Sequence, residues 1–253
     1  WDAGALAGIA PLVAVVCDAP VTLPAPHADV PRLPLADAPA CATFLTEQLF
    51  AKELGPQAPR AVTGVLLAGG RSSRMGTDKA RLVVDGAALL PALSERLSEV
   101  CDGGVLVVRR SGQELPALPP AVRVVEDLLP DLGPLGGLLT GLAAATTPFV
   151  FLAACDMPRL DQTLIRWLID HPCRADVLLP QRDGHAEPVH ALYGARCLGA
   201  IKEAVLSGEL GMGSWLGSVR VQRVAEEEWR RVHPTGDSFL NVNTPEDLAR
   251  IER

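Results

Sequence analysis

The sequence lacks the marks of three common classes of protein. It has no excess of positive charge, because 23 Lys and Arg face 30 Asp and Glu for a net charge of −7, and this argues against a nucleic-acid partner. No apolar run reaches the roughly 18 residues that span a bilayer, so we expect no membrane partner. The 6 cysteines form no CxxC or Cys/His ligand pattern, which indicates free thiols in the reducing cytoplasm.

The chain does contain ample apolar material. Its 253 residues are 48% hydrophobic, enough for a substantial core. Composition divides it in two. Residues 1–60 are rich in proline and alanine, with one expected strand at 12–17 and one expected helix at 39–54, whereas residues 61–253 have a regular α/β rhythm.

From residue 62 onward, short apolar runs alternate with helical patterns. Strands are expected at 62–68, 105–108, 122–126, 148–153, 177–180 and 189–193, and helices at 90–100, 135–145, 161–170 and 197–206, with a last helix after 244. This alternation predicts an α/β fold: a three-layer, Rossmann-like, mostly parallel sheet with helices on both faces. Ligands of such sheets bind at the carboxyl ends of the strands.

The first expected strand leads into a glycine-rich loop that could hold phosphates. The run LLAGGRSSRMGTDK occupies residues 66–79. Glycines bring backbone N–H groups close to a phosphate chain, and Arg74 and Lys79 add positive charge. The run matches neither the Walker A nor the GxGxxG pattern. A bare Gly-Gly pair would indicate only an ordinary turn.

A carboxylate ends another buried strand of the predicted sheet. Asp156 follows the apolar run 149–154 and would face the ligand crevice, where it could hold Mg²⁺. Its local sequence alone favours a simpler role, the capping of the turn at Met157-Pro158.

Together these motifs resemble the molybdenum cofactor guanylyltransferases, the MobA-like branch of the nucleotidyltransferase superfamily. The run 66–79 is similar to that family's signature, and four later motifs follow in the family's order: 125–127, 133–137, 155–158 and 241–247. The resemblance covers about residues 62–253. It implies transfer of GMP from GTP to molybdopterin, with release of pyrophosphate and formation of the guanine dinucleotide cofactor.

The resemblance also implies roles for individual residues. The catalytic residues would be Arg74, Lys79 and Asp156, and the nucleotide would be bound by Leu67, Ala68, Gly69, Gly70, Lys79, Asp127 and Asp156. Mg²⁺ would be held by Asp156 and Asn241, with Asn243 as an equal alternative to Asn241. The molybdopterin side would be formed by Glu187, Pro188 and His190.

One position departs from the family pattern. Better-known members place an asparagine that contacts the nucleotide at the end of the second strand, where this chain has Val108. The contact is therefore lost, or it is made by Arg109 or Arg110.

Residues 1–60 show a weaker resemblance. They are similar to the tail of a MobB-type adaptor, a P-loop GTP-binding protein whose Walker A loop would lie upstream of Trp1. An unrelated extension explains them equally well. The partners that the resemblance implies are such an adaptor, fused or separate, and molybdoenzyme maturation proteins.

Two other functions remain open at the level of sequence. A molybdopterin cytidylyltransferase is the first, although Gly69 favours the guanylyl branch because the cytidylyl branch more often has alanine there. The second is a non-catalytic GTP-binding module. The intact Arg74, Lys79, Asp127 and Asp156 argue against such a module, and Val108 argues slightly for it.

Overall fold

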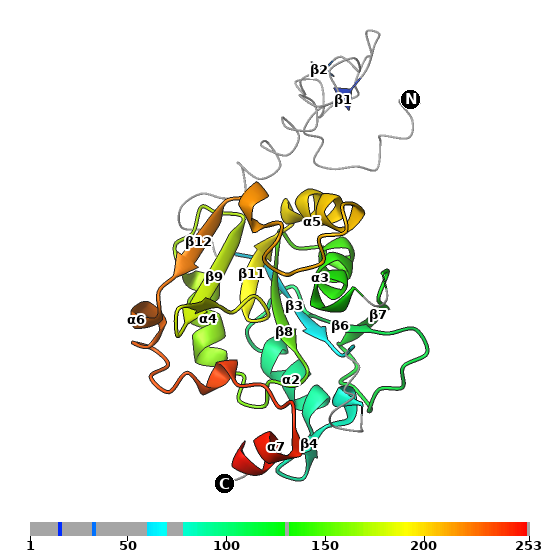
Figure 1. Cartoon of the computed structure of the whole chain (residues 1–253). Helices are drawn as coiled ribbons and strands as arrows, with labels where there is room; N and C mark the ends of the chain where they lie inside the picture. Colours follow the sequence, from blue (N-terminus) through cyan, green and yellow to red (C-terminus); the bar gives the residue numbers. More distant parts are fainter. Residues whose placement is uncertain (1–14, 17–31, 34–59, 70–77, 130–131, 252–253) are drawn as a thin grey trace. The chain divides into compact units, whose positions relative to one another are not determined.

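The chain divides into two units, Trp1–Ala58 and Pro59–Arg253. The computed structural model describes residues 15–16, 32–33, 60–69, 78–129 and 132–251 (Figure 1). In the first unit these are β1 (Val15–Val16) and β2 (Arg32–Leu33), which pair in parallel. The strand expected at 12–17 contains β1, and the helix expected at 39–54 lies outside the described residues.

The second unit is built on one eight-stranded sheet. Its strands follow the order β10-β9-β11-β8-β3-β6-β7, and β12 also pairs with β9. The strands are β3 (Val62–Leu67), β6 (Val105–Arg109), β7 (Arg123–Glu126), β8 (Phe149–Ala154), β9 (Val177–Arg182), β10 (His185–Ala186), β11 (Ala191–Gly194) and β12 (Val221–Val224). Every expected strand of this unit is present in the sheet, and β10 and β12 are additional strands of the sheet.

The sheet is mostly parallel, as expected, and its antiparallel part has a local cause. Strand β3 pairs in parallel with β6 and β8, whereas β11 runs antiparallel to both β8 and β9. After β9 the chain reverses through Asp183 and Gly184, with φ of 49° and 75°. Two adjacent residues with positive φ form the tight hairpin turn that Asp-Gly favours, and this turn leads into β10.

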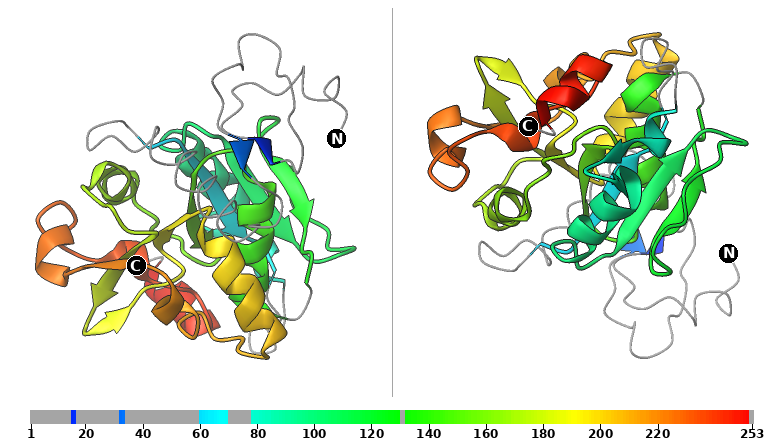
Figure 2. Two further views of the ribbon diagram at one scale, coloured as in Figure 1. Left: turned by 90° about the horizontal axis from the view of Figure 1, so that it is seen from above. Right: turned by 90° about the horizontal axis from the view of Figure 1, so that it is seen from below.

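Helices cover both faces of the sheet and give the expected three layers (Figures 1 and 2). On one face lie α2 (Leu89–Ser98) and α4 (Gln162–Asp170), and on the other α3 (Gly133–Ala144) and α5 (Cys197–Leu206). The expected cap of α4 is confirmed, because Asp161 Oδ1 accepts from Leu164 N at 2.8 Å.

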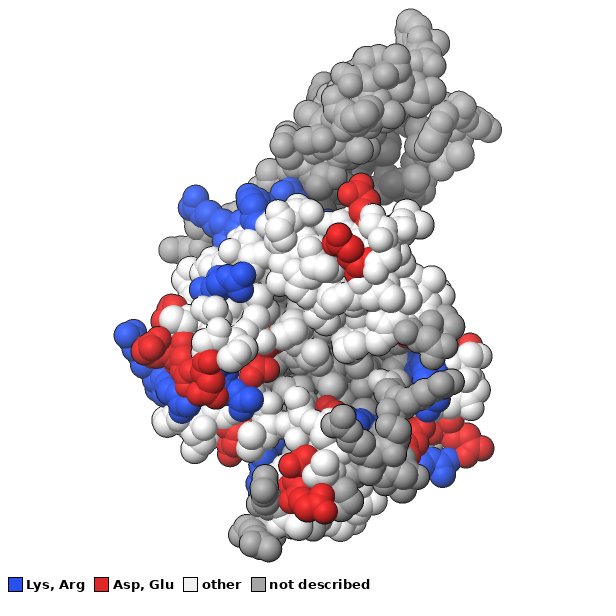
Figure 3. Space-filling model, viewed as in Figure 1, with Lys and Arg blue, Asp and Glu red and all other residues white. Residues whose placement is uncertain are grey.

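Charges of both signs share the surface. In Figure 3, acidic and basic side chains lie next to one another at the two sides of the view. Several charged side chains of the described residues form ion pairs, such as Arg220 with Asp176 at 3.2 Å. Among the described residues, no helix is both long and apolar enough to cross a membrane.

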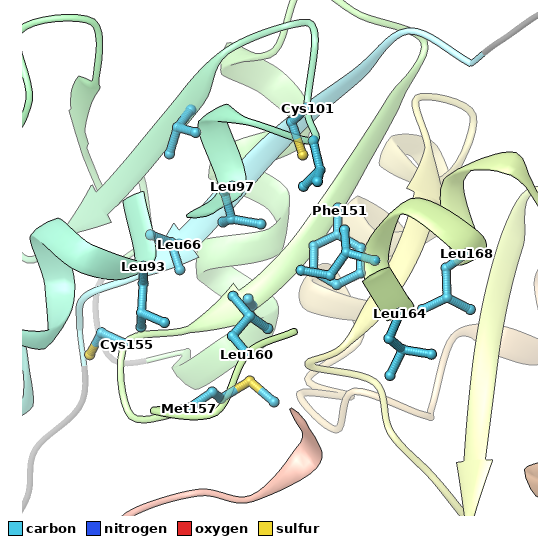
Figure 4. Close-up of a cluster of buried hydrophobic side chains, with 14 of the residues drawn as sticks. Leu66, Leu93, Leu97, Cys101, Phe151, Cys155, Met157, Leu160, Leu164 and Leu168 are labelled. Carbon is cyan, nitrogen blue, oxygen red and sulfur yellow. The ribbon is translucent and has the colours of Figure 1, made fainter. Parts of the chain in front are cut away.

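The hydrophobic core consists of two clusters, one on each face of the sheet. Successive strand residues point to opposite faces, so Leu66 and Phe151 pack with α2 and α4, while Val65 packs with α3 and α5. Figure 4 shows the first cluster, in which Leu93 and Leu97 of α2 lie near Leu66. Both faces of β3 are therefore buried, which explains its continuous apolar sequence.

Short elements complete the second unit. A second Asp-Gly turn, at Asp85 and Gly86, joins β4 (Val83–Val84) to β5 (Ala87–Ala88). The remaining elements are η3 (Lys79–Arg81), η4 (Leu216–Ser218), α6 (Glu226–Trp229), η5 (Asp237–Phe239) and α7 (Pro245–Ile251). The expected start of α7 is confirmed, because Thr244 N donates to Asp247 Oδ2 and Asp247 N to Thr244 Oγ1.

Candidate active site

Backbone hydrogen bonds bring three distant segments together at the carboxyl end of the sheet. Cys155 N, just after β8, donates to Leu67 O of β3 at 3.1 Å. Val242 N, near the carboxyl terminus, donates to Asp156 O at 2.8 Å. The ends of β3 and β8 and the segment before α7 therefore form one frame for the side chains between them.

Lys79 and Asp156 form the central charged pair of this frame. Lys79 opens η3, and its Nζ donates to Asp156 Oδ2 at 2.5 Å and to Asn243 Oδ1 at 2.7 Å. The side chains of Lys79 and Asp156 are only 18% and 12% exposed, so water screens their attraction little. The other carboxylate oxygen, Asp156 Oδ1, is buried and has no hydrogen-bond partner among the described residues.

Asp127 is held in place by groups that the sequence did not mark. It directly follows β7, and its Oδ1 accepts from Leu129 N at 3.1 Å and from Thr140 Oγ1 at 3.0 Å. Thr140 lies on α3, and its hydroxyl also accepts from Leu128 N at 3.0 Å. These bonds fix the carboxylate at the edge of the frame.

A cavity of about 440 Å³ connects these groups and has the size of a small-molecule site. Helix α3 closely approaches β3 beside it, since a Cβ on Gly137 would lie 2.5 Å from Leu67 Cδ2. The lining consists of Leu67, Gly69, Lys79, Val108, Arg109, Arg110, Asp127, Gly133, Pro134, Gly137, Ala154, Cys155, Asp156, Val189 and Asn241.

The structure places most of the predicted nucleotide and metal residues at this cavity. Five of the predicted nucleotide-binding residues line it, and so does the predicted metal ligand Asn241. Ala68 has a buried side chain, and its backbone lies between Leu67 and Gly69. Gly70 and Arg74 lie outside the described residues. Asn243, the alternative to Asn241, contacts Lys79, so both asparagines belong to the site.

The departure at Val108 leaves an apolar wall beside two arginines. Val108 is 2% exposed and lines the cavity together with Arg109 and Arg110. The Nε atoms of both arginines are buried and have no hydrogen-bond partner among the described residues. The Val108 side chain offers no hydrogen-bonding group to this part of the cavity. The guanidinium groups of Arg109 and Arg110 are the polar groups next to it.

The three residues predicted on the molybdopterin side have different environments. Glu187 is partly buried and pairs with Arg182 at 2.9 Å, and burial raises the pKa of its carboxyl. Pro188 is half-buried, and its carbonyl accepts from Tyr193 Oη at 2.6 Å. The His190 side chain is fully buried and cannot touch a substrate in this conformation; Val189 lines the cavity instead.

The cavity wall also contains a thiol. Cys155 is 2% exposed, and burial raises its pKa to about 12. A thiol with so high a pKa is almost entirely protonated at neutral pH and is a poor nucleophile. Cys155 therefore supplies no thiolate nucleophile at neutral pH.

The donors present fit a divalent cation. Such cations prefer oxygen ligands. The buried Oδ1 of Asp156 has no hydrogen-bond partner among the described residues, and Asn241 lines the same cavity. Among the described residues, no group of three or more His, Cys, Asp or Glu could enclose a metal ion by itself. A cation here would complete its coordination with oxygens from other sources, such as the asparagines, water or a substrate.

This fold and site are those of a nucleotidyltransferase, with a lysine of η3 paired to a carboxylate that follows a parallel strand of the sheet. A family model described as the MobA-like NTP transferase domain matches residues 64–224. The chain belongs to this family, and it is an enzyme of the nucleotidyltransferase type.

Individual relatives agree with this assignment. The molybdenum cofactor guanylyltransferase of Desulfosudis oleivorans is 34% identical over 197 residues, which span 76% of this chain and 95% of that protein. That of Syntrophotalea carbinolica is 35% identical over 195 residues, spanning 76% and 90%. The crystal structure of molybdopterin-guanine dinucleotide biosynthesis protein A from Archaeoglobus fulgidus superposes with a TM-score of 0.63 at 25% identity, covering 75% of this chain and 96% of that one.

Proposed function

We propose that the protein transfers GMP from GTP to molybdopterin and releases pyrophosphate, which produces the guanine dinucleotide form of the cofactor. The observation that carries the proposal is the contact of Lys79 with Asp156 and Asn243 at a cavity that Asp127 also lines. The choice of GTP as the nucleotide and molybdopterin as the acceptor is supported by the relatives named molybdenum cofactor guanylyltransferase.

In the proposed reaction, an oxygen of the terminal phosphate of molybdopterin attacks the α-phosphorus of GTP. The bond from that phosphorus to the oxygen that bridges to the β-phosphate breaks, and pyrophosphate leaves with the electron pair. The Lys79 ammonium neutralises phosphate charge, and the backbone at Gly69 lets the phosphates approach closely. Most of the acceleration then comes from positioning and electrostatic stabilisation.

Mg²⁺ belongs to this proposal as the cofactor. Asp156 would hold it through the unpartnered Oδ1, with Asn241 or Asn243 as a further oxygen ligand. When bound, the ion would neutralise charge on the phosphate oxygens. Backbone hydrogen bonds hold the proposed ligands of the ion in place. The carbonyl of Asp156 accepts from Val242 N, and Asn243 N donates to Asp247 Oδ2 at 3.0 Å.

The guanine and the molybdopterin would be recognised at opposite ends of the cavity. Arg109 and Arg110 supply donors near Val108, and arginine donors suit the acceptor atoms O6 and N7 of guanine. Glu187 and Pro188, next to Val189, would face the molybdopterin. The proposed protein partners are an adaptor of the MobB type and molybdoenzyme maturation proteins. Residues 1–60 would be the tail of such an adaptor, fused to the transferase.

A transfer assay with wild-type protein, Mg²⁺ and molybdopterin tests the function directly. GTP should release pyrophosphate and yield the dinucleotide, and CTP should do so far more slowly. Preference for CTP would assign the cytidylyl alternative, and binding of GTP without pyrophosphate release would assign the non-catalytic module.

The role of Asp156 is tested by Asp156→Asn, which keeps the size of the side chain but removes its charge. We expect transfer to fall by at least about a hundredfold, because a carboxylate that stabilises the phosphates through a metal is lost. Asp170→Asn, an exposed change at the end of α4, is the matched control and should keep wild-type activity. Full activity of Asp156→Asn would refute the proposed site.

A further inference from the structure

Gln113 is a buried amide next to the active site to which the proposed reaction gives no role. It ends a turn that follows β6, closed by the bond from Gln113 N to Arg110 O at 3.1 Å, with Gly112 at a φ of 68°. Its side chain points inward, and the residue is only 6% exposed. A buried primary amide needs partners for its two N–H groups and its oxygen.

Each polar atom of the Gln113 side chain has such partners. Nε2 donates to Ala68 O at 2.9 Å and to the Asp78 carboxylate at 2.9 and 3.0 Å. Oε1 accepts from Arg110 N at 3.0 Å. The reversed amide would place N–H against N–H at Arg110, and oxygen against oxygen at Ala68 and Asp78, so its partners fix its orientation.

These partners lie near the two ends of the glycine-rich run. Ala68 directly follows β3, and Asp78 directly precedes Lys79. Asp78 is also the N-cap of η3, because its Oδ1 accepts from Ala80 N at 3.0 Å. The Gln113 amide thus joins the end of β3 to Asp78, the residue directly before Lys79. The Lys79 side chain in turn contacts Asp156.

We propose that Gln113 is a positioning residue, which sets the place of Lys79 relative to the end of β3 and thereby to the phosphates of the nucleotide. This inference rests on the proposed function for the identity of the nucleotide. The geometry distinguishes Gln113 from the nearby pair of Arg110 with Asp78 at 3.1 Å. That pair is more exposed and joins only two groups, whereas the Gln113 amide joins three.

The first test compares Gln113→Met with Gln162→Met. Gln162 is a matched control, because its Nε2 also joins a backbone carbonyl, Arg96 O at 3.0 Å, to a carboxylate, Glu99 Oε2 at 2.8 Å, outside the cavity. We expect Gln113→Met to raise the Kd for GTP with Mg²⁺ and lower kcat/KM for GTP by roughly tenfold to a hundredfold, the cost of a displaced catalytic group. Gln162→Met should leave both constants unchanged.

A purely structural role would give a different result. Both variants would then melt at a lower temperature, yet Gln113→Met would keep the wild-type Kd and kcat/KM when assayed well below that temperature. This outcome would overturn the proposal. A wild-type protein that binds GTP but transfers nothing would refute the proposed reaction and leave the Kd comparison valid, whereas a wild-type protein that binds no GTP would refute both.

A charge exchange tests the contact itself and does not depend on how Gln113→Met folds. Gln113→Glu places a second carboxylate against Asp78 and the Ala68 carbonyl, so it should raise the Kd for GTP at least as much as Gln113→Met. Adding Asp78→Asn supplies an amide donor opposite the new carboxylate and should recover part of the loss. A Gln113→Glu protein with wild-type Kd, or a double variant with no recovery, would contradict the assigned geometry.

Discussion

The environment of His190 is unusual for an imidazole. The ring is fully buried, lies between Phe151 and Phe239 with centroid distances of 5.1 and 4.4 Å, and neither nitrogen has a hydrogen-bond partner among the described residues. Burial, helped by the charge of His233, lowers its pKa to about 3. The folded protein therefore keeps His190 neutral, while the unfolded chain protonates it near its ordinary pKa of about 6.5.

This difference predicts a loss of stability in acid. Below about pH 6.5 the unfolded state takes up a proton that the folded state refuses until about pH 3, so stability falls as the pH falls through this window. Between pH 7.5 and pH 5 the loss from this one residue is about 2 kcal/mol. Urea unfolding of His190→Phe at both pH values should show a correspondingly smaller drop than wild type, with an unchanged m value. An equal drop in the two proteins would show that His190 titrates normally.

The place of a residue at the cavity was predictable where its side chain follows a recognisable strand or motif. Lys79, Asp127 and Asp156 could be placed there because each sits in a motif of the family's order. Gln113 could not, because its partners Ala68 and Asp78 lie 45 and 35 positions away, and Arg-Ser-Gly-Gln in sequence indicates only a turn. The substrate-side assignment of His190 came from the motif around it, which gives no sign that the ring points into the core.

At the scale of elements, close packing of α3 on β3 determines which residues the helix tolerates. A Cβ on Gly141 would lie 2.7 and 2.9 Å from the two methyl groups of Val65, which is fully buried and stiff at χ1. The α3 glycines therefore keep the helix close to the sheet, with Gly137 beside the cavity. Helix propensity alone predicts low stability for a helix with this many glycines, so the sequence gives no sign of their packing role.

Two alanine substitutions separate packing from propensity. Gly141→Ala should destabilise the fold by about 1–2 kcal/mol, because overpacking costs about 1–3 kcal/mol and improved helix propensity returns up to about 1 kcal/mol. Gly199→Ala, in α5 where a Cβ would meet nothing within 4 Å, should stabilise it by up to about 1 kcal/mol. Urea unfolding measures both changes. Equal effects of the same sign would argue against close packing of α3 on β3.

The elements differ in how far sequence could predict them. The buried strands were found because both faces of the sheet are covered, so their apolar runs are continuous. The hairpins at Asp85-Gly86 and Asp183-Gly184 have a sequence signal, since Asp-Gly favours tight turns. Their strands β4, β5 and β10 are only two residues long, too short for an alternating pattern. Strand β12 is four residues long and lies on a partly exposed edge, so its sequence pattern is weak.

For the whole molecule, the described core and cavity residues all belong to the second unit. Both hydrophobic clusters fall within residues 62–251, and every described lining residue of the cavity falls within 67–241. A protein shortened to residues 59–253 should therefore fold cooperatively and retain GMP transfer with GTP. Thermal unfolding by circular dichroism and the transfer assay would check this. Loss of transfer with an intact fold would instead assign residues 1–58 a part in the reaction.

The position of β3 between β6 and β8 also has a consequence for biosynthesis. As the chain leaves the ribosome, β3 meets β6 early, but its other edge stays without a partner until β8 has been made. Lys79 and Asn243 are separated by 164 positions, which at roughly 5–20 residues per second amounts to on the order of ten seconds of translation. A nascent chain would therefore carry Lys79 and Asp156 well before residues 242 and 243 are made, so the contacts of Lys79 with Asn243 and of Asp156 with Val242 would form only after residue 243 has left the ribosome.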